Sequence, residues 1–438
     1  MTRTVQQARR WVAIFRIRPC QAYAASLLAL SSGLWAGPSA AQQAGEAPVV
    51  LNEAEAVQRA LSRPALTGTW GAQVAAAKAQ AKSAGAWPNP TANYIREQSF
   101  TQPQSQGEDF ALVQQQLPIS GRRGLLAQAA QQRAKAQALQ NEAARLALAA
   151  RVRRAFYRVL ALQQRVEVRE QALKRVQAVA EDFAQRVEAG ESPAYQLERV
   201  RQDVAEIRAA LDVDAAALAR QRIRLAQQVG VTPLQRTLRV DGVLVPQTLP
   251  DADALERAIR QRPELEAAEQ RIEAARLQRR AAARAWLPEP QVTAGFKGAQ
   301  IGSQYFSGFT AGVNFPVPVL NQRVGRRLQA QAQLSQALYR RERIERRLRA
   351  QLLGAATEAR RLKATVERYR KEAIDRSERV FATVLRAHQG GELDILEVVE
   401  ASRGVMHARL QGVQLASQAR ASEIALQRRL QRLPRISG

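Results

Sequence analysis

Three acidic side chains near the C-terminal end of the chain have a spacing that could do chemistry. Asp394, Glu397 and Glu400 recur every three residues, so on a helix they lie near one face. Carboxylates placed in this way could guide cations or ligate a metal. Pairing with Arg403 and its neighbours on a solvated surface is the simpler interpretation, and we predict no metal site from these residues.

Other side chains that commonly carry catalysis are scarce. The chain has one cysteine, Cys20, and two histidines, His388 and His407. A zinc site or catalysis by a histidine pair is therefore not expected, and solvated histidines are the simpler interpretation of both. The sequence also lacks a glycine-rich nucleotide-binding loop and any carboxylate pair that stands out from its Arg-Glu background. We expect no enzymatic activity and no cofactor.

A second group of candidate residues surrounds two glycine turns, at residues 188–193 and 388–393. Glycine adopts the left-handed conformation that ends many helices. The flanking side chains could dock a partner protein or form a gate, and turn geometry alone is the competing explanation. The candidates are Arg186, Gly190, Glu191, Ser192, Tyr195, Arg386, Gly390, Gly391 and Asp394.

The elements that must position these turns occur twice, about 200 residues apart. Pro90 matches Pro290, and Gly190 matches Gly390. Between these landmarks two helical stretches carry apolar residues at matching positions. The buried-type positions of the two helical stretches lie 200 residues apart: they are Leu148, Val152, Ala155, Val159, Leu162 and Val166 in the first, and Leu348, Leu352, Ala355, Ala359, Leu362 and Val366 in the second. The internal duplication predicts two copies of one structural unit.

Each unit is dominated by long helices. A first helix is expected over residues 53–86 and again over 251–285, each ending at a proline-rich break. Very long helices follow over 125–188 and 322–388, with returning helices over 193–229 and 394–433. In the first long helix a heptad pattern with one clear break, at Arg169, predicts packing against a partner helix in a coiled coil.

Between the helices the apolar period changes from about 3.6 to 2, which indicates strands. Strand pairs are expected over 91–100 with 108–117, and over 291–300 with 305–315. Each strand has about the length that a tilted strand needs to cross a bilayer. Tyr305, Phe306 and Phe309 are expected to face lipid or the interface belt. Four strands cannot close a barrel, so two, three or four copies must assemble.

The N-terminal residues have the pattern of a Sec signal peptide over residues 1–41, with a basic segment, an apolar segment and a small-residue cleavage site. Cys20 precedes the apolar segment, so we expect no lipid anchor. The remaining domains are a first repeat over 42–236, containing a β-hairpin at 91–117 and a coiled hairpin at 125–229, a linker over 237–250, and a second repeat over 251–438. The second repeat contains a β-hairpin at 291–317 and a coiled hairpin at 322–433.

Charge alone would suggest another class of protein. The formal net charge is +27, a value often associated with nucleic-acid binding. Here the arginines are spread through helical repeats among Glu and Gln, and no nucleic-acid motif accompanies them. We therefore interpret the charge as a solvated surface and expect no nucleic-acid partner.

In this order of elements the chain resembles the TolC-like outer-membrane efflux proteins of Gram-negative bacteria. The matched glycine turns and the prolines that follow the second strand of each pair, Pro118 and Pro316, carry the resemblance. The segments QQQLPISGRR and VNFPVPVLNQRVGRR look like those of the branch that serves heavy-metal exporters. The high basic charge departs from common family members.

The resemblance implies a mainly α fold with a β-barrel portion. Long antiparallel coiled-coil hairpins and four transmembrane strands per chain would form a homotrimeric barrel and a helical tunnel. The protein would be a passive conduit in the outer membrane, extending into the periplasm and serving a tripartite efflux system. Its expected partners are a periplasmic adaptor protein, an inner-membrane pump, which we expect to be proton-driven, and outer-membrane lipid. Alternative classes are a periplasmic coiled-coil adaptor or scaffold without membrane strands and a basic nucleic-acid-binding protein.

Overall fold

The structure is a computed structural model that describes residues 49–100, 106–190, 193–231, 238–246, 257 and 259–430. They all belong to one compact unit, Glu46–Gly438. The predicted signal peptide, residues 1–41, lies outside the described residues.

The N-terminal helical region is divided in two. Helix α1 (Glu53–Leu61) begins with a capping box, in which the Asn52 side chain accepts from the Glu55 backbone and the Glu55 side chain accepts from the Asn52 backbone. Helix α2 (Pro64–Gly85) starts anew because Pro64 holds the preceding Arg63 in an extended conformation. The single helix expected over 53–86 is therefore two helices.

Four strands form one antiparallel sheet in the order β2-β3-β5-β6. Their bounds are Thr91–Ser99, Gln106–Gln116, Gln291–Ile301 and Gln304–Asn314. The two predicted hairpins are present, and β3 pairs with β5 along its whole length. The two halves of the chain therefore meet in a single sheet, with β2 and β6 as its edges.

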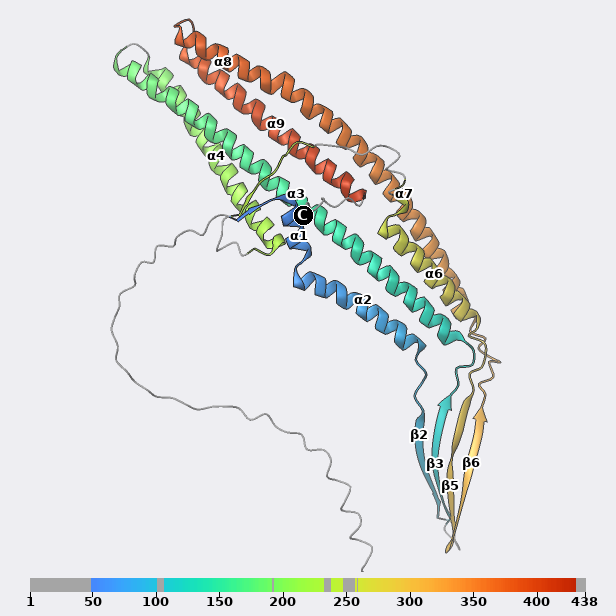
Figure 1. Cartoon of the computed structure of the whole chain (residues 1–438). Helices are drawn as coiled ribbons and strands as arrows, with labels where there is room; N and C mark the ends of the chain where they lie inside the picture. Colours follow the sequence, from blue (N-terminus) through green and yellow to red (C-terminus); the bar gives the residue numbers. More distant parts are fainter. Residues whose placement is uncertain are drawn as a thin grey trace, which may run out of the picture. The chain divides into compact units, whose positions relative to one another are not determined.

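Long helices continue from the end of the sheet opposite the loops that join its strands, and they form two helical hairpins (Figure 1). In the first half α3 (Arg122–Glu188) has 67 residues and returns through α4 (Ala194–Val229). The second half has α6 (Pro263–Ala283), α7 (Val324–Tyr369), a π-helical turn η1 (Arg370–Ile374), α8 (Asp375–Gln389) and α9 (Ile395–Arg429). Helix α3 contacts both α4 and α9, and α9 contacts α7 and α8. The helix expected over 322–388 is thus interrupted by one π turn.

The seam between the helices follows the heptad pattern. Val152 and Val159 on α3 are fully buried, and their counterparts Leu352 and Ala359 on α7 are buried as well. Much of this core is alanine and valine, which lets helix axes approach closely.

The break in the heptad at Arg169 is occupied by an ion pair. Arg169 Nε lies 2.7 Å from a carboxylate oxygen of Asp214 on α4, and Arg165 Nη2 lies 2.8 Å from the other oxygen. Asp214 is buried, so two guanidinium groups are available to compensate its charge. The polar residue in the seam therefore joins the two helices of the hairpin instead of interrupting their packing.

The segment between the halves contributes a short strand that the sequence pattern did not indicate. Strand β4 (Leu238–Val240) pairs in parallel with β1 (Val49–Leu51). Beyond it, the Arg420 guanidinium on α9 donates to the backbone carbonyls of Val243, Leu244 and Val245. This segment is thereby fastened to the helices near the middle of their length.

The fold class is confirmed as mainly α with a sheet portion, built from duplicated helical hairpins and four strands. Within the described ranges, none of the helices is both long enough and apolar enough to cross a membrane. The domain boundaries given above remain a prediction.

Candidate functional site

One face of the sheet is apolar and exposed. The register places Phe296 opposite Phe309, with Tyr94 and Val113 on neighbouring strands of the same face. Phe309 is 85% exposed and Phe296 is 74% exposed. Aromatic side chains on a free sheet face need an apolar surrounding, so this face suits contact with lipid.

The opposite face is more polar. It presents Asn93, Gln114, Thr293 and Thr310, which alternate with the apolar set along the strands. Toward the hairpin loops Lys297 Nζ lies 2.8 Å from Glu108. A sheet with one lipid-compatible face and one hydrated face is suited to line a water-filled passage.

At the far end of the long helices, glycines in the left-handed conformation end α3 and α8. Gly190 has φ 77° and Gly391 has φ 76°. Gly390 has φ −81°, an ordinary right-handed value. The structural counterpart of Gly190 is therefore Gly391, whereas the sequence alignment paired Gly190 with Gly390. A Cβ at Gly190 or Gly391 would have no other atom within 4 Å. The two turns around these glycines, called the tips of the helical hairpins below, are therefore open to a partner.

The candidate residues at the tips have local partners. Arg186 pairs with Asp182 at 3.2 Å, and Arg386 Nε donates to the Ala382 carbonyl. Tyr195 is 70% exposed, and its hydroxyl accepts from the Gln196 side chain at 3.4 Å. Glu191 and Ser192 lie outside the described residues.

Asp394 caps α9, because its side chain accepts from the backbone of Ile395 at 2.6 Å. Glu400 pairs with Arg199 of α4 at 3.8 Å, and Arg403 pairs with Asp203 of α4 at 2.7 Å. Of the three acidic residues, only Glu400 forms an ion pair within the described chain, and its partner is Arg199 instead of Arg403. Among the described residues no group of His, Cys, Asp or Glu could hold a metal ion.

These contacts bring the two tips together. Phe183 of α3, Leu197 of α4 and Ile395 of α9 form a small apolar cluster just behind the turns. Burial raises the pKa of Asp203, while its partner Arg403 opposes that shift. Sequence reasoning missed Asp203 and Arg199, because a partner on another helix leaves no local signal.

The π turn accounts for the shift between the two glycines. Val166 and Val366 occupy equivalent seam positions 200 residues apart, whereas Gly190 and Gly391 are 201 apart. A π turn accommodates one extra residue in a helix. From the last residue of η1 onward the offset is 201: Ile374 and Val384 align with Leu173 and Phe183 of α3, so the seam stays in phase.

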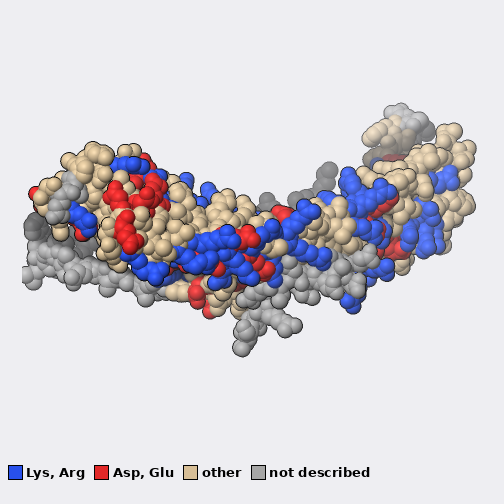
Figure 2. Space-filling view, turned by 90° about the horizontal axis from the view of Figure 1, so that it is seen from above, with Lys and Arg blue, Asp and Glu red and all other residues tan. Residues whose placement is uncertain are grey.

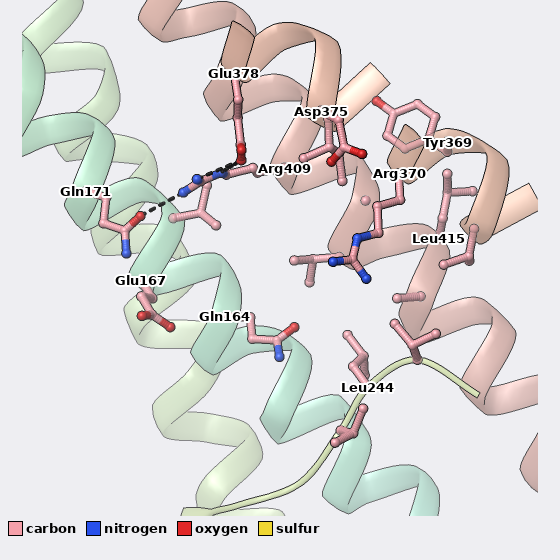
Figure 3. Close-up of a pocket in the computed structure, with 18 of the residues that line it drawn as sticks. Gln164, Glu167, Gln171, Leu244, Tyr369, Arg370, Asp375, Glu378, Arg409 and Leu415 are labelled. Atoms are coloured by element: carbon pink, nitrogen blue, oxygen red, sulfur yellow. Dashed lines mark hydrogen bonds and ion pairs between the residues drawn. The ribbon is translucent and has the colours of Figure 1, made fainter. Parts of the chain in front are cut away.

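A pocket of about 650 Å³ lies beside this turn. Figure 3 shows Gln171 of α3 across from Glu378 of α8, with Arg409 of α9 between them. The Arg409 guanidinium donates to Gln171 at 2.9 Å and to Glu378 at 2.8 Å. This bridge ties α3, α8 and α9 together at the level of the insertion.

Charge is distributed unevenly over the surface. Figure 2 shows Lys and Arg in bands over the visible face, with the largest group of acidic side chains toward its left end. On α6 and α7, burial lowers the pKa of Arg271, and the nearby Arg340 lowers it further. The described acidic groups include no ion-pair partner for either arginine.

Comparisons with known proteins agree with this geometry. Residues 254–430 match the family described as outer membrane efflux protein. The structure is similar to a membrane protein from Pseudomonas aeruginosa, with 19% identity, a TM-score of 0.73, and coverage of 86% of this chain and 93% of that one. Comparison with the curated proteins found no match.

Two named outer-membrane proteins have the same fold. VceC of Vibrio cholerae shares 18% identity, with a TM-score of 0.69 and coverage of 86% of this chain and 95% of that one. The CmeC outer membrane channel of Campylobacter jejuni shares 12% identity, with a TM-score of 0.73 and coverage of 92% and 94%.

The fold is thus that of the outer-membrane channels with a helical tunnel. The second half of the chain carries an outer membrane efflux protein domain, and the resemblance to the TolC-like family is confirmed.

Proposed function

We propose that the protein is the outer-membrane channel of a tripartite efflux system. The observation that carries the proposal is a sheet of four strands, 9 to 11 residues long, that continues directly into two helical hairpins. Each chain supplies a piece of barrel wall and a piece of tunnel, and neither piece closes alone.

Assembly follows from the two sheet edges. Strands β2 and β6 each have a partner on one side only. Unpaired backbone groups in lipid cost several kcal/mol each, so the edges must pair with other copies. The family resemblance favours three copies, which would give a barrel of twelve strands.

The conduit itself is passive. Energy would come from an inner-membrane pump, which we propose to be proton-driven, joined through a periplasmic adaptor. The tips around Gly190 and Gly391 are the proposed adaptor contact and entrance, with Arg186, Glu191, Ser192, Tyr195, Arg386, Gly390 and Asp394 around them. Cargo would enter from the periplasm or the pump, and the segments that resemble the heavy-metal branch make metal cations the first cargo to test, before drugs.

The alternative is a periplasmic adaptor or scaffold without membrane strands. The exposed apolar face around Phe296 and Phe309 disfavours it, because a water-soluble scaffold would have no use for that surface. The described strand lengths in both halves also match a membrane crossing.

The test combines fractionation with conductance. The expressed protein should be recovered in the outer membrane, migrate as a cross-linked trimer, and give discrete conductance steps in planar bilayers. Recovery in the soluble periplasm, or a bilayer without conductance at any protein concentration, would overturn the proposal.

A further inference from the structure

Six arginines gather where the helices meet the sheet, and we propose that they bind the phosphate groups of anionic phospholipids. This arginine collar consists of Arg122, Arg123, Arg284, Arg323, Arg326 and Arg327. The inference rests on the proposed function, because that function places the sheet in a bilayer and the collar at its surface.

The helices next to the sheet contain almost no acidic residues. On α3 the first acid is Glu142, and on α7 it is Glu342, about twenty residues into each helix. Helix α2 has two lysines and no acid, and the only acid between Arg276 and Arg341 is Glu289. This part of the described chain is therefore strongly positive, and the chain's excess charge is concentrated here instead of being evenly spread.

The positive charges of the arginine collar are not neutralised by acidic side chains of the described part of the chain. None of its six arginines has an ion pair in the described part of the chain. Glu289, the nearest acid in sequence, accepts from Ser120 at 2.6 Å and from Gln116 instead. Arg123 donates to the Ala86 carbonyl, and Arg122 Nε is buried without a partner.

Helix ends strengthen the positive potential. Helices α3 and α7 both begin in the collar, with no acid in the first turn and no side-chain cap at Gly121 or Arg323. Their free N–H groups and positive dipole ends favour anions at the same level as the arginines. Arginines at such a position are unfavourable unless an anion balances them.

An apolar girdle lies between the collar and the sheet, which points to lipid as the source of the anion. Trp87, Trp286 and Ile119 are 66%, 53% and 68% exposed, and Leu320 is fully exposed. Tryptophan favours the headgroup level of a bilayer, and arginine beside it reaches the phosphates. Free phosphate would explain the arginines but not this girdle.

The opposite end of the sheet has a different composition. There the charges are mixed and paired, as in Lys297 with Glu108 and Arg96 with Asp109. Further copies of the chain cannot neutralise the collar either, because symmetry places the same acid-poor segments at the same height. The remaining partner for this surface is the anionic leaflet beside the helices.

The experiment titrates phosphatidylglycerol into the detergent-solubilised full chain and follows the thermal transition, with phosphatidylcholine and inorganic phosphate as separate titrants. Phosphatidylglycerol should bind more tightly than phosphatidylcholine. The double variant Arg326→Gln with Arg327→Gln should weaken that binding roughly 30-fold, because one arginine near an anionic surface is worth about fivefold in affinity. Added salt should weaken it as well.

The matched control is Arg343→Gln with Arg347→Gln, which removes the same charge from the same helix outside the collar. It should leave phosphatidylglycerol binding unchanged. Arg323→Gly separates a structural role from a lipid role. Arg323 has a left-handed φ of 56°, so glycine relieves strain there, yet we expect about fivefold weaker phosphatidylglycerol binding.

Three results would overturn the inference: equal affinity for the two lipids, stabilisation by inorganic phosphate equal to that by phosphatidylglycerol, or an equal loss in the control variant. Failure of the proposed function is seen separately, because the wild-type chain would then not enter vesicles of either lipid.

Discussion

Ile374, the last residue of the π turn, packs against Gly412 of α9. A Cβ at Gly412 would lie 2.5 Å from Ile374 Cδ1, so no side chain fits there without movement. The contact is made by the terminal methyl group of Ile374, so any side chain at position 412 requires Ile374 to change its conformation.

Substitution of Gly412 should therefore behave differently from substitution of Gly404 on the same helix. Gly404→Leu has free space and should raise the free energy of unfolding by roughly 0.5–1 kcal/mol, through helix propensity. Gly412→Leu should lower it by about 1–3 kcal/mol through overpacking. Chemical unfolding in detergent measures both, and similar shifts for the two variants would contradict the packing account.

Deletion of one residue should be tolerated in η1 and not in α3. Removal of Lys371 restores the offset of 200 found between Val166 and Val366, so the second half should form a regular helix with its seam in phase. Removal of Glu170 from α3 turns all later seam residues by about 100°. Outer-membrane abundance and a structure of the first variant test this, and normal abundance of the Glu170 deletion would refute it.

The tips predict a contrast between adjacent glycines. Gly190→Val and Gly391→Val place a branched side chain at positive φ, at a local penalty of about 1–2 kcal/mol, and should impair efflux without lowering abundance. Gly390→Val, at a right-handed φ, avoids this backbone penalty, so an equal loss of efflux in this variant would assign the effect to the adaptor contact instead of the turn. Gly190→Asn keeps the turn, so full activity of this variant would limit the role of Gly190 to turn geometry.

The two faces of β6 predict opposite effects of a charge. Phe309→Arg puts a guanidinium on the apolar face and should reduce insertion, since the cost reaches about 2–4 kcal/mol at mid-bilayer. Thr310→Arg, its neighbour on the polar face, should insert normally and alter conductance. Heat-modifiable migration of the inserted trimer reads out both variants, and normal insertion of Phe309→Arg would mean that Phe309 faces the lumen.

Much of the fold was determined by the sequence itself, because the signals involved are local. Pro64 separates α1 from α2 through its own backbone geometry, and left-handed glycines end other helices. The heptad through Val152 and Val159 identifies the buried stripe of α3 without reference to its partner. Duplication then extended each assignment to the second half.

Only the tertiary structure decided the relationships between distant segments. The pairing of β3 with β5 and of β1 with β4 joins residues that share no local signal. The partner of Arg169 proved to be Asp214 on the returning helix. Gly391 rather than Gly390 matches Gly190, because a π turn absorbs one residue between them. Contacts of this kind depend on which surfaces meet, and periodicity along one chain segment carries no information about the surface opposite.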